Sequence, residues 1–528
     1  MKQIFWYYFF CILTDVARFI LRTVLVFLHG SKGKIVPSAD NPLLLKSATQ
    51  LAQEIRNGEL KSEDVVQSYI DRIKEVEPYI HATAEKCFED ALEKAKGVDS
   101  LVSSGQYTKQ QLADEKLFLG VPISIKALLL VKGVRSTAGY EPYSHLIAPE
   151  DAQAVGLLKN AGAIVITTTN VPEMGLNIDT ANRLYGATNN PYDTNRSSGG
   201  SSGGESALIG AGGSLLGIGN DLLGSVRIPA HFTGIFSHKP TRGLTPNSGC
   251  FPPDWLFDEP KLMDPEIYKH VSVGPMCRYA EDLMTSMKIL SSKSGTKLNF
   301  QKQLDFRKLK IYYLKEIKSP MVPSVEKDIA DGLMKAVSYF ERVYDIKPRE
   351  VKIPSLYDSN RCVFNILLET IKDFKDLLTC GKGLPFNEKL DFLKCFIGKS
   401  QLCFGTLFTF NFAFFPLWYK KAQIDHYQKM LKEWIDEFDA ILDEDSVLLM
   451  PTLPITAFYH EEMLLKFPSS CYTSIFNVLG LPVTHCPMGL NREGLPYGIQ
   501  VVGCKNNDPL TIACGMELEK AFGGWRNP

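Results

Sequence analysis

The sequence predicts an α/β protein organised around one sheet, and its composition and net charge exclude several other classes of protein. From Leu117 onward, short β-rich runs alternate with segments of helical periodicity, as in a sheet with helices packed on it. A hydrophobic fraction of 45% and a charged fraction of 22% exclude a disordered, collagen-like or disulfide-stabilised miniature protein. The net charge of −1 argues against a nucleic-acid partner, because such proteins normally carry a basic excess.

The N-terminal segment, residues 1–30, is predicted to be a membrane anchor helix. Ile4–Leu28 is apolar except around Asp15, Arg18 and Arg22, whose spacing places them on one helical stripe. As a helix this stretch is about 37 Å long, enough to cross a bilayer. A cleaved signal peptide is the alternative, but no small-residue cleavage site follows. A retained anchor is therefore favoured, and both a spanning and an in-plane helix stay open.

A polar linker is expected over residues 31–46, followed by two helices within residues 47–77. Gly58 marks the end of the first helix, since glycine readily adopts the left-handed conformation that ends helices. Ser62 is expected to cap the second helix, whose apolar residues recur at helical spacing.

The alternating part of the chain contains two predicted strand and helix groups. Leu117–Ile125 and Gly162–Thr168 are expected to be buried strands, joined by a helix over Ala152–Asn160. A strand over Leu309–Leu314 and a helix near Val325–Val343 repeat the pattern. Both groups favour an α/β sheet.

An aromatic cluster lies within Leu402–Tyr419, a stretch of eighteen residues without a charge. A membrane span is rejected because the sequence after residue 450 resembles part of the same globular core. A helix buried on all sides and a hydrophobic cap over residues 395–420 both remain. The density of aromatics favours a cap that dips into a membrane or lines an apolar substrate channel. Its channel candidates are Phe404, Phe408, Phe412, Phe415 and Trp418.

Two serine-bearing glycine turns are the candidate reactive centre. The loop Ser197–Gly204 is predicted to open a helix inside the core, as an anion or oxyanion site would. Ser225 follows a short strand on a tight turn, which Asp221 and Arg227 are expected to brace as an ion pair. Lys126 ends an apolar strand; if it is buried, desolvation lowers its pKa and makes it a candidate base.

The cysteines predict no metal centre. The chain has 12 cysteines, none in a Cys-x-x-Cys pair and none at zinc-ligand spacing from a histidine. They are expected to be reduced and mostly buried, which suits a catalytic domain facing a reducing compartment.

Over residues 47–525 the sequence resembles the amidase signature family. Ordered motifs carry the resemblance, at Gly120–Lys126, Thr169–Glu173, Asn190–Pro191, Gly199–Glu205, Gly219–Pro229, His238–Thr241, Gly274–Arg278 and Gly494–Gln500. Their shared order is specific, although no single motif is. The resemblance implies one large catalytic domain over residues 47–528, with a central mixed twisted sheet covered by helices on both faces.

The resemblance also implies a catalytic set. Lys126 matches the catalytic lysine, Ser201 the bridging serine that follows a cis peptide, and Ser225 the nucleophile. Neutral Lys126 would accept a proton from Ser201, which would accept one from Ser225. No metal or organic cofactor is expected. The implied oxyanion hole consists of the N–H groups of Leu222, Leu223, Gly224 and Ser225, with Gly200, Ser202, Asp221 and Arg227 in support.

Leu223 departs from the family, which usually has Gly or Ala there. If that position requires φ > 0, leucine costs about 1–2 kcal/mol. Its side chain would also crowd the acyl group. Ala127 likewise replaces the usual acidic residue after the lysine.

The expected function is membrane-associated hydrolysis of fatty-acid amides by a serine hydrolase. The expected partners are a lipid amide substrate and a membrane, and a homodimer is compatible with this interpretation. Two alternatives are a soluble amidotransferase subunit that releases ammonia from glutamine, and a non-catalytic lipid-binding protein. A glycan on the sequon Asn195–Ser197 would obstruct the candidate site. This favours a cytosolic catalytic domain on an intracellular membrane.

Overall fold

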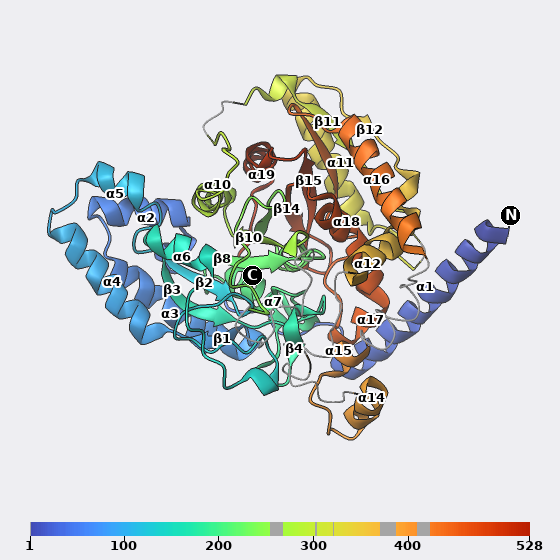
Figure 1. The fold of residues 1–528 in the computed structure, drawn as a ribbon, viewed down its shortest axis with the longest axis horizontal. Coiled ribbons are helices and arrows are strands. Elements are labelled where there is room, and N and C mark those ends of the chain that lie inside the picture. Colours follow the sequence, from blue (N-terminus) through green and yellow to red (C-terminus); the bar gives the residue numbers. More distant parts are fainter. Residues whose placement is uncertain are drawn as a thin grey trace.

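A sheet of eleven strands organises the described part of the protein (Figure 1). The computed structural model describes residues 2–253, 268–300, 304–319, 321–369, 378, 387–408 and 423–528. In spatial order the strands are β1 (Thr83–Lys86), β3 (Ile164–Thr169), β2 (Pro122–Lys126), β8 (Leu216–Asp221), β10 (Ser272–Cys277), β9 (Phe236–Lys239), β14 (Val483–Leu490), β15 (Pro496–Gly503), β13 (Ser446–Pro451), β11 (Lys310–Tyr313) and β12 (Arg349–Glu350).

The sheet is mixed, as the family resemblance implied. Strand β2 runs parallel to β3 and β8, and β11 runs parallel to β12 and β13. The other neighbouring pairs are antiparallel. Two small hairpins lie outside the sheet, β4 (Ala181–Asn182) with β5 (Gly186–Ala187) and β6 (Asn189–Asn190) with β7 (Asp193–Ser197).

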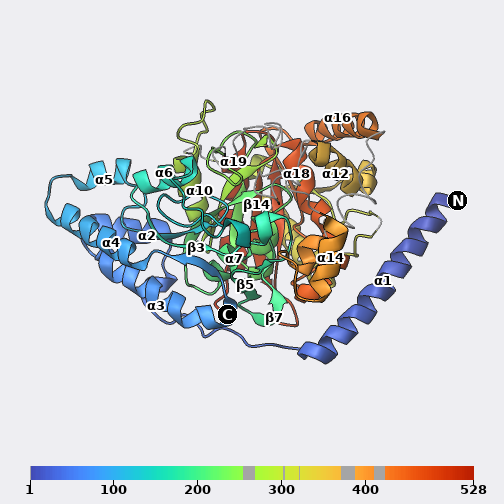
Figure 2. The ribbon, with the colours of Figure 1, turned by 60° about the horizontal axis from the view of Figure 1, so that its bottom comes forward.

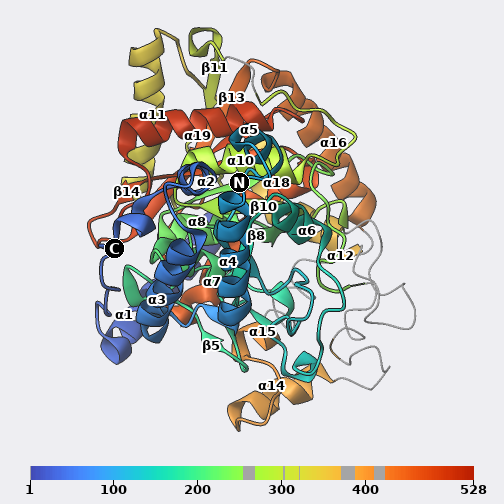
Figure 3. The same ribbon diagram turned by 90° about the vertical axis from the view of Figure 1, so that its left-hand side faces the viewer.

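Helices flank this sheet. Those described are α1 (Lys2–His29), α2 (Ala48–Asn57), α3 (Ser62–Ile80), α4 (Phe88–Ser103), α5 (Lys109–Glu115), α6 (Gln153–Asn160), α7 (Gly203–Gly210), α8 (Arg227–Thr233), α10 (Ala280–Leu290), α11 (Lys327–Tyr344), α12 (Ser359–Glu369), α14 (Glu388–Phe396), α15 (Phe404–Phe408), α16 (Ile424–Ile441), α17 (Met463–Lys466), α18 (Cys471–Leu479) and α19 (Asp508–Phe522). Figure 3 shows α3 and α4 nearest the viewer, at the end of the sheet that holds β1 and β3.

The sheet separates two apolar cores. Along β13, Val447 and Leu449 point into a core shared with α3, α10 and α19, while Leu448 and Met450 point into a second core shared with α12, α16 and α18. Successive strand residues face opposite sides, so a strand apolar at every position needs cover on both. The prediction of helices on both faces is confirmed.

Most element predictions are confirmed. The expected strands and helices correspond to β2, β3, β11, α6 and α11, and Gly58 ends α2 at φ 74°. The expected cap at Ser62 is wrong. Ser62 is already the first residue of α3, and its hydroxyl donates to the Gly120 carbonyl at 2.8 Å rather than capping the helix.

The N-terminal segment forms α1, a helix of 28 residues. No helix in the described ranges combines the length and apolar character that crossing a bilayer requires, so the expected spanning anchor is not supported. Figure 2 shows α1 along one side of the molecule, its N-terminal end pointing away from the body.

Residues 31–46, the expected polar linker, pack on the body. The Val36 N–H donates to the Pro191 carbonyl at 3.0 Å, and Lys34 accepts from the Thr194 N–H at 2.9 Å. Val36 and Leu44 are buried. This segment therefore joins α1 to the catalytic body along a fixed path.

Candidate active site

The candidate residues meet at one edge of the sheet. Lys126 ends β2, and Asp221 ends the neighbouring parallel strand β8. Parallel strands place their carboxyl ends at the same edge, so the lysine and the turn after β8 lie close together. The loop before α7, which carries Ser201, completes the group.

Lys126 contacts Ser201 directly. Lys126 Nζ lies 2.8 Å from Ser201 Oγ and donates to the Asn220 carbonyl at 3.1 Å. The lysine is fully buried, and this desolvation lowers its pKa to about 7 against the opposing influence of the Asp221 and Glu205 charges. A large fraction of this amine is therefore neutral near pH 7 and able to accept a proton.

The glycine and serine loop is held tightly. The Gly200–Ser201 peptide is cis, as the resemblance implied. A Cβ on Gly200 would lie 2.7 Å from the Asn177 carbonyl oxygen, so only glycine fits there. The Thr180 hydroxyl donates to the Gly199 carbonyl at 2.8 Å. These contacts fix the position of the Ser201 hydroxyl.

Ser225 lies next to this loop, where the Ser202 N–H donates to the Ser225 carbonyl at 3.1 Å. The described contacts include no hydrogen bond between the hydroxyls of Ser201 and Ser225. Ser225 is partly exposed while Ser201 is buried, so Ser225 is the serine that faces the adjoining pocket.

The expected oxyanion hole needs one correction. The Gly224 N–H donates to Asp221 Oδ1 at 2.7 Å and is therefore occupied. Within the described residues, no hydrogen bond engages the N–H groups of Leu222, Leu223 and Ser225. Gly224 instead shapes the turn, with φ at +120° and the Thr473 side chain where a Cβ would lie.

The predicted ion pair braces this turn from below. Arg227 contacts both Asp221 carboxylate oxygens at 3.1 Å, and both side chains are fully buried. Burial alone would raise the pKa of Asp221, but the Arg227 charge and hydrogen bonds lower it to about 2.

Asn477, which the sequence did not indicate, donates to Asp221 at 3.0 Å and accepts from Arg227 at 2.8 Å. Gln500, which lies in a quoted motif, also contacts Arg227 at 3.5 Å.

The backbone strain considered for Leu223 does not occur. Neither Leu222 nor Leu223 has a positive φ. The Thr473 hydroxyl donates to the Leu223 carbonyl at 2.6 Å and holds the turn. Thr473 carries no sequence signal, because it lies 250 residues from Leu223 along the chain.

An apolar pocket opens beside Ser225. It is lined by Gly175, Leu176, Asn177, Ile178, Leu222, Leu223, Ser225, Ile228, Phe364, Leu367 and Phe467. Among the described residues this lining includes no charged side chain. Leu222 and Leu223 are both part of the lining.

The expected cap is described only in part. Phe404 and Phe408 of α15 contact one another, with ring centroids 6.1 Å apart, but they do not line the pocket beside Ser225. Phe412, Phe415 and Trp418 lie outside the described residues. The buried Glu173 accepts from the Cys403 N–H at 2.9 Å, and its burial raises its pKa to about 7. This contact ties the start of α15 to the segment that leads into the pocket.

Comparison with known proteins places this geometry in a family. The pattern of the family described as Amidase matches residues 64–512. Fatty-acid amide hydrolase 2-A of Danio rerio is 38% identical over 93% of this chain and 92% of its own. Fatty-acid amide hydrolase 2 of Homo sapiens is 35% identical over 92% of this chain and 91% of its own.

A solved structure described as fatty acid amide hydrolase superposes with a TM-score of 0.71 at 20% identity, covering 92% of this chain and 86% of that one. It shares the fold, with the same mixed sheet between helices. Because the family pattern and both relatives span most of the sequence, the chain belongs to the amidase signature family and is an amide-hydrolysing serine hydrolase.

Proposed function

We propose that this chain is a membrane-associated hydrolase that cleaves the amide bond of fatty-acid amides, giving a fatty acid and an amine. The observation that carries the proposal is the buried Lys126 amine 2.8 Å from Ser201, on the loop that also contacts Ser225 beside an apolar pocket. The names of the two relatives at 35–38% identity support the substrate class.

In the proposed reaction Ser225 is the nucleophile and Lys126 the base. The Ser225 hydroxyl gives its proton to Ser201, whose own proton passes to the neutral Lys126 amine, while Ser225 Oγ bonds to the amide carbon. When the C–N bond breaks, the proton returns along the same path to the leaving amine. Water then enters, is deprotonated by the same relay, and releases the fatty acid from Ser225.

The turn after β8 would stabilise the charged intermediate. The N–H groups of Leu222, Leu223 and Ser225 are the donors offered to the oxyanion, each worth roughly 3–4 kcal/mol. The Asp221–Arg227 pair holds that turn through the Gly224 and Val226 N–H groups. Donors fixed in advance need no reorganisation during the reaction.

The pocket favours an acyl chain over glutamine. Glutamine carries an ammonium and a carboxylate that would each need a charged or hydrogen-bonding partner when desolvated. In the described lining, Asn177 and Ser225 supply the polar side chains and the rest is apolar. An alkyl chain gains about 0.8 kcal/mol for each CH₂ buried there.

The structure removes the reason for considering a lipid-binding role without catalysis. That alternative rested on Leu223 as a residue that distorts the oxyanion turn. Leu223 has no positive φ, and the Lys126–Ser201 contact is in place. The unstrained turn and the Lys126–Ser201 contact support a working enzyme.

Helix α1 supplies the proposed membrane contact. The side chains exposed on its outer side are Phe9, Ile12, Leu13, Val16, Phe19, Ile20, Val24, Phe27 and Leu28. On the inner side Arg18 and Leu25 are buried against the body. A helix that directs charge toward its own protein and apolar side chains outward is suited to lie in the interface of a membrane.

The sequon supports a cytosolic orientation of the catalytic domain. Asn195 Nδ2 donates to the His29 carbonyl at 2.8 Å, at the end of α1. A glycan on that nitrogen would displace α1 from the body. This contact supports a catalytic domain on the cytosolic side of an intracellular membrane, where this modification does not occur.

Covalent labelling tests the nucleophile. Wild-type protein should react with a fluorophosphonate probe and hydrolyse N-acyl amides, and Ser225→Ala should abolish labelling and lower kcat by at least about 10⁴-fold. Ser104→Ala, a change of an exposed serine beyond α4, should leave both intact. Undiminished labelling in Ser225→Ala would remove Ser225 from its proposed role.

The pH profile tests the base. Activity requires neutral Lys126, so kcat/KM should fall about tenfold per pH unit below pH 7 and level off above it. Glu205→Gln should move this limb to lower pH, because the Glu205 charge raises the pKa of Lys126. A profile that climbs only near pH 10 would mean that the lysine stays charged in the working range.

Vesicle co-sedimentation tests the membrane face. Phe19 and Phe27 are 73% and 88% exposed on α1, and burying one phenylalanine is worth about 1.5–3 kcal/mol. The double variant Phe19→Asp/Phe27→Asp should weaken binding to phosphatidylcholine vesicles by about 100-fold or more. Val343→Asp, at an exposed position of α11, is the matched control. Equal binding of the double variant and wild type would refute this role of α1.

A further inference from the structure

The C-terminal half of α1 is attached to the residues directly before the catalytic loop. Arg22 of α1 contacts Glu493 at 2.9 Å, and the same carboxylate contacts Arg196 at 3.0 Å. Arg196 immediately precedes Ser197, the first residue of that loop. One carboxylate, in the turn between β14 and β15, therefore bridges α1 and the loop.

Two further contacts reach the same place. The His29 ring at the end of α1 stacks on the Tyr459 ring, and the Arg196 guanidinium lies 4.0 Å from the centroid of the same ring. The Tyr459 hydroxyl donates to the Gly30 carbonyl at 3.1 Å. The Glu493 bridge and the Tyr459 ring link α1 to Arg196, and the Asn195–His29 hydrogen bond links it to the adjacent residue Asn195.

The path continues from Arg196 into the active site. Ser197 is fully buried, and its N–H donates to the Phe458 carbonyl at 2.8 Å. Its hydroxyl donates to Asp179 at 2.6 Å and accepts from the Gly199 N–H at 2.9 Å. Gly199 lies two residues before Ser201. These contacts form a continuous path from Arg196 to the serine that Lys126 contacts.

We propose that α1 is a positioning element of the active site: docked on the body, it holds Arg196 through Glu493 and so keeps the Ser197–Ser201 segment in register with Lys126. The inference rests on the proposed catalytic role of Ser201 and adds a second task to the helix that carries the membrane face. Arg22, Glu493 and Arg196 are positioning residues.

The charges explain why α1 matters to this arrangement. The Arg196 side chain is only 4% exposed and needs an acidic partner, whereas the Glu493 side chain is 50% exposed and is held from the other side by Arg22. Asp193, the second acidic neighbour of Arg196, lies 3.6 Å away. Without Arg22, Glu493 regains side-chain freedom, and the bridge to Arg196 loosens.

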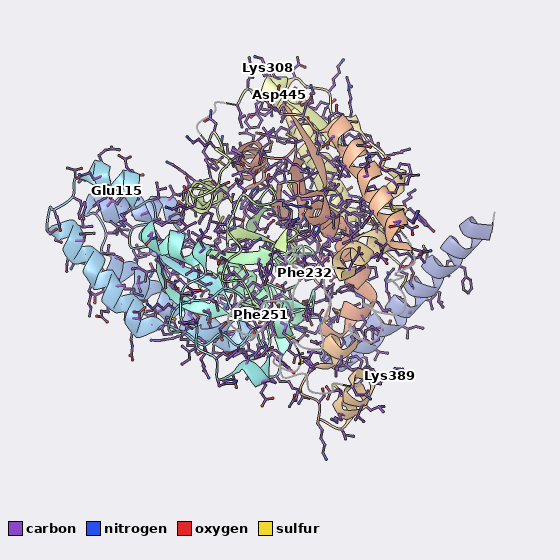
Figure 4. The ribbon with its side chains drawn as sticks, viewed as in Figure 1. Glu115, Phe232, Phe251, Lys308, Lys389 and Asp445 are labelled. Carbon is purple, nitrogen blue, oxygen red and sulfur yellow. The ribbon has the colours of Figure 1, made fainter. Side chains whose placement is uncertain are left out.

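The test uses the full-length chain and a short soluble acyl anilide, so that membrane binding does not enter the measurement. Arg22→Gln should lower kcat about threefold with KM unchanged, and Arg22→Lys should restore it. Backbone hydrogen exchange over residues 195–204 should rise in Arg22→Gln and not in Arg22→Lys. Lys310→Gln is the matched control, because it removes a comparably exposed ion pair with Asp443. This pair lies near Lys308 and Asp445, far from Phe232 of α8 (Figure 4). The control should change neither kcat nor hydrogen exchange.

A double-mutant cycle completes the test. Glu493→Gln should lower kcat more than Arg22→Gln, and adding Arg22→Gln to it should cause no further loss, because both act through one bridge. Unchanged exchange and kcat in Arg22→Gln, or losses that add in the double variant, would overturn the inference. A wild type that neither labels nor hydrolyses would refute the proposed function instead, and the exchange measurement would still decide whether α1 positions the loop.

Discussion

The burial of one lysine at the end of β2 is the constraint on which the candidate site depends. An ammonium group without a carboxylate partner is costly to desolvate, so burial lowers the pKa of Lys126 to about 7 and leaves about half of the amine neutral at pH 7. That state makes the residue a base and sets the pH range in which the enzyme can work. The sheet supplies the burial: β2 lies inside it between β3 and β8, and every residue of β2 is buried.

The buried Asp221 and Arg227, which support the turn after β8, keep their charges, unlike Lys126. Asp221 and Arg227 are both fully buried yet stay ionised, because they contact each other and Asn477 completes their hydrogen bonds. Breaking such a pair by removing one partner typically costs about 3–5 kcal/mol. Here the pair also holds the Gly224 and Val226 N–H groups, and so fixes the turn that presents Ser225. Burial therefore favours the neutral form of Lys126, which can act as a base, whereas Asp221 and Arg227 stay charged and hold the turn rigid.

The sequence was informative where function depends on local pattern. Strand and helix alternation predicted the sheet, the family resemblance grouped Lys126, Ser201 and Ser225, and the turn pattern predicted the Asp221–Arg227 pair. It was silent where a contact joins distant segments. Thr473 and Asn477 come from α18, about half the chain away from the turn they support, and Phe364, Leu367 and Phe467 of the pocket carry no local signature. The apolar character of α1 was visible in the sequence, but its docking on Glu493 and Tyr459 depends on tertiary packing.

A direct titration of Lys126 tests the central claim. The full-length enzyme, labelled with ε-¹³C-lysine, would be followed by NMR across the pH range, with resonances assigned by Lys126→Met and by Lys239→Met. The second variant is needed because burial also lowers the pKa of Lys239 to about 7. The account predicts a resonance, lost only in Lys126→Met, that titrates near pH 7. A Lys126 resonance that stays in its protonated form to about pH 9 or above, closer to the ordinary lysine value, would contradict it.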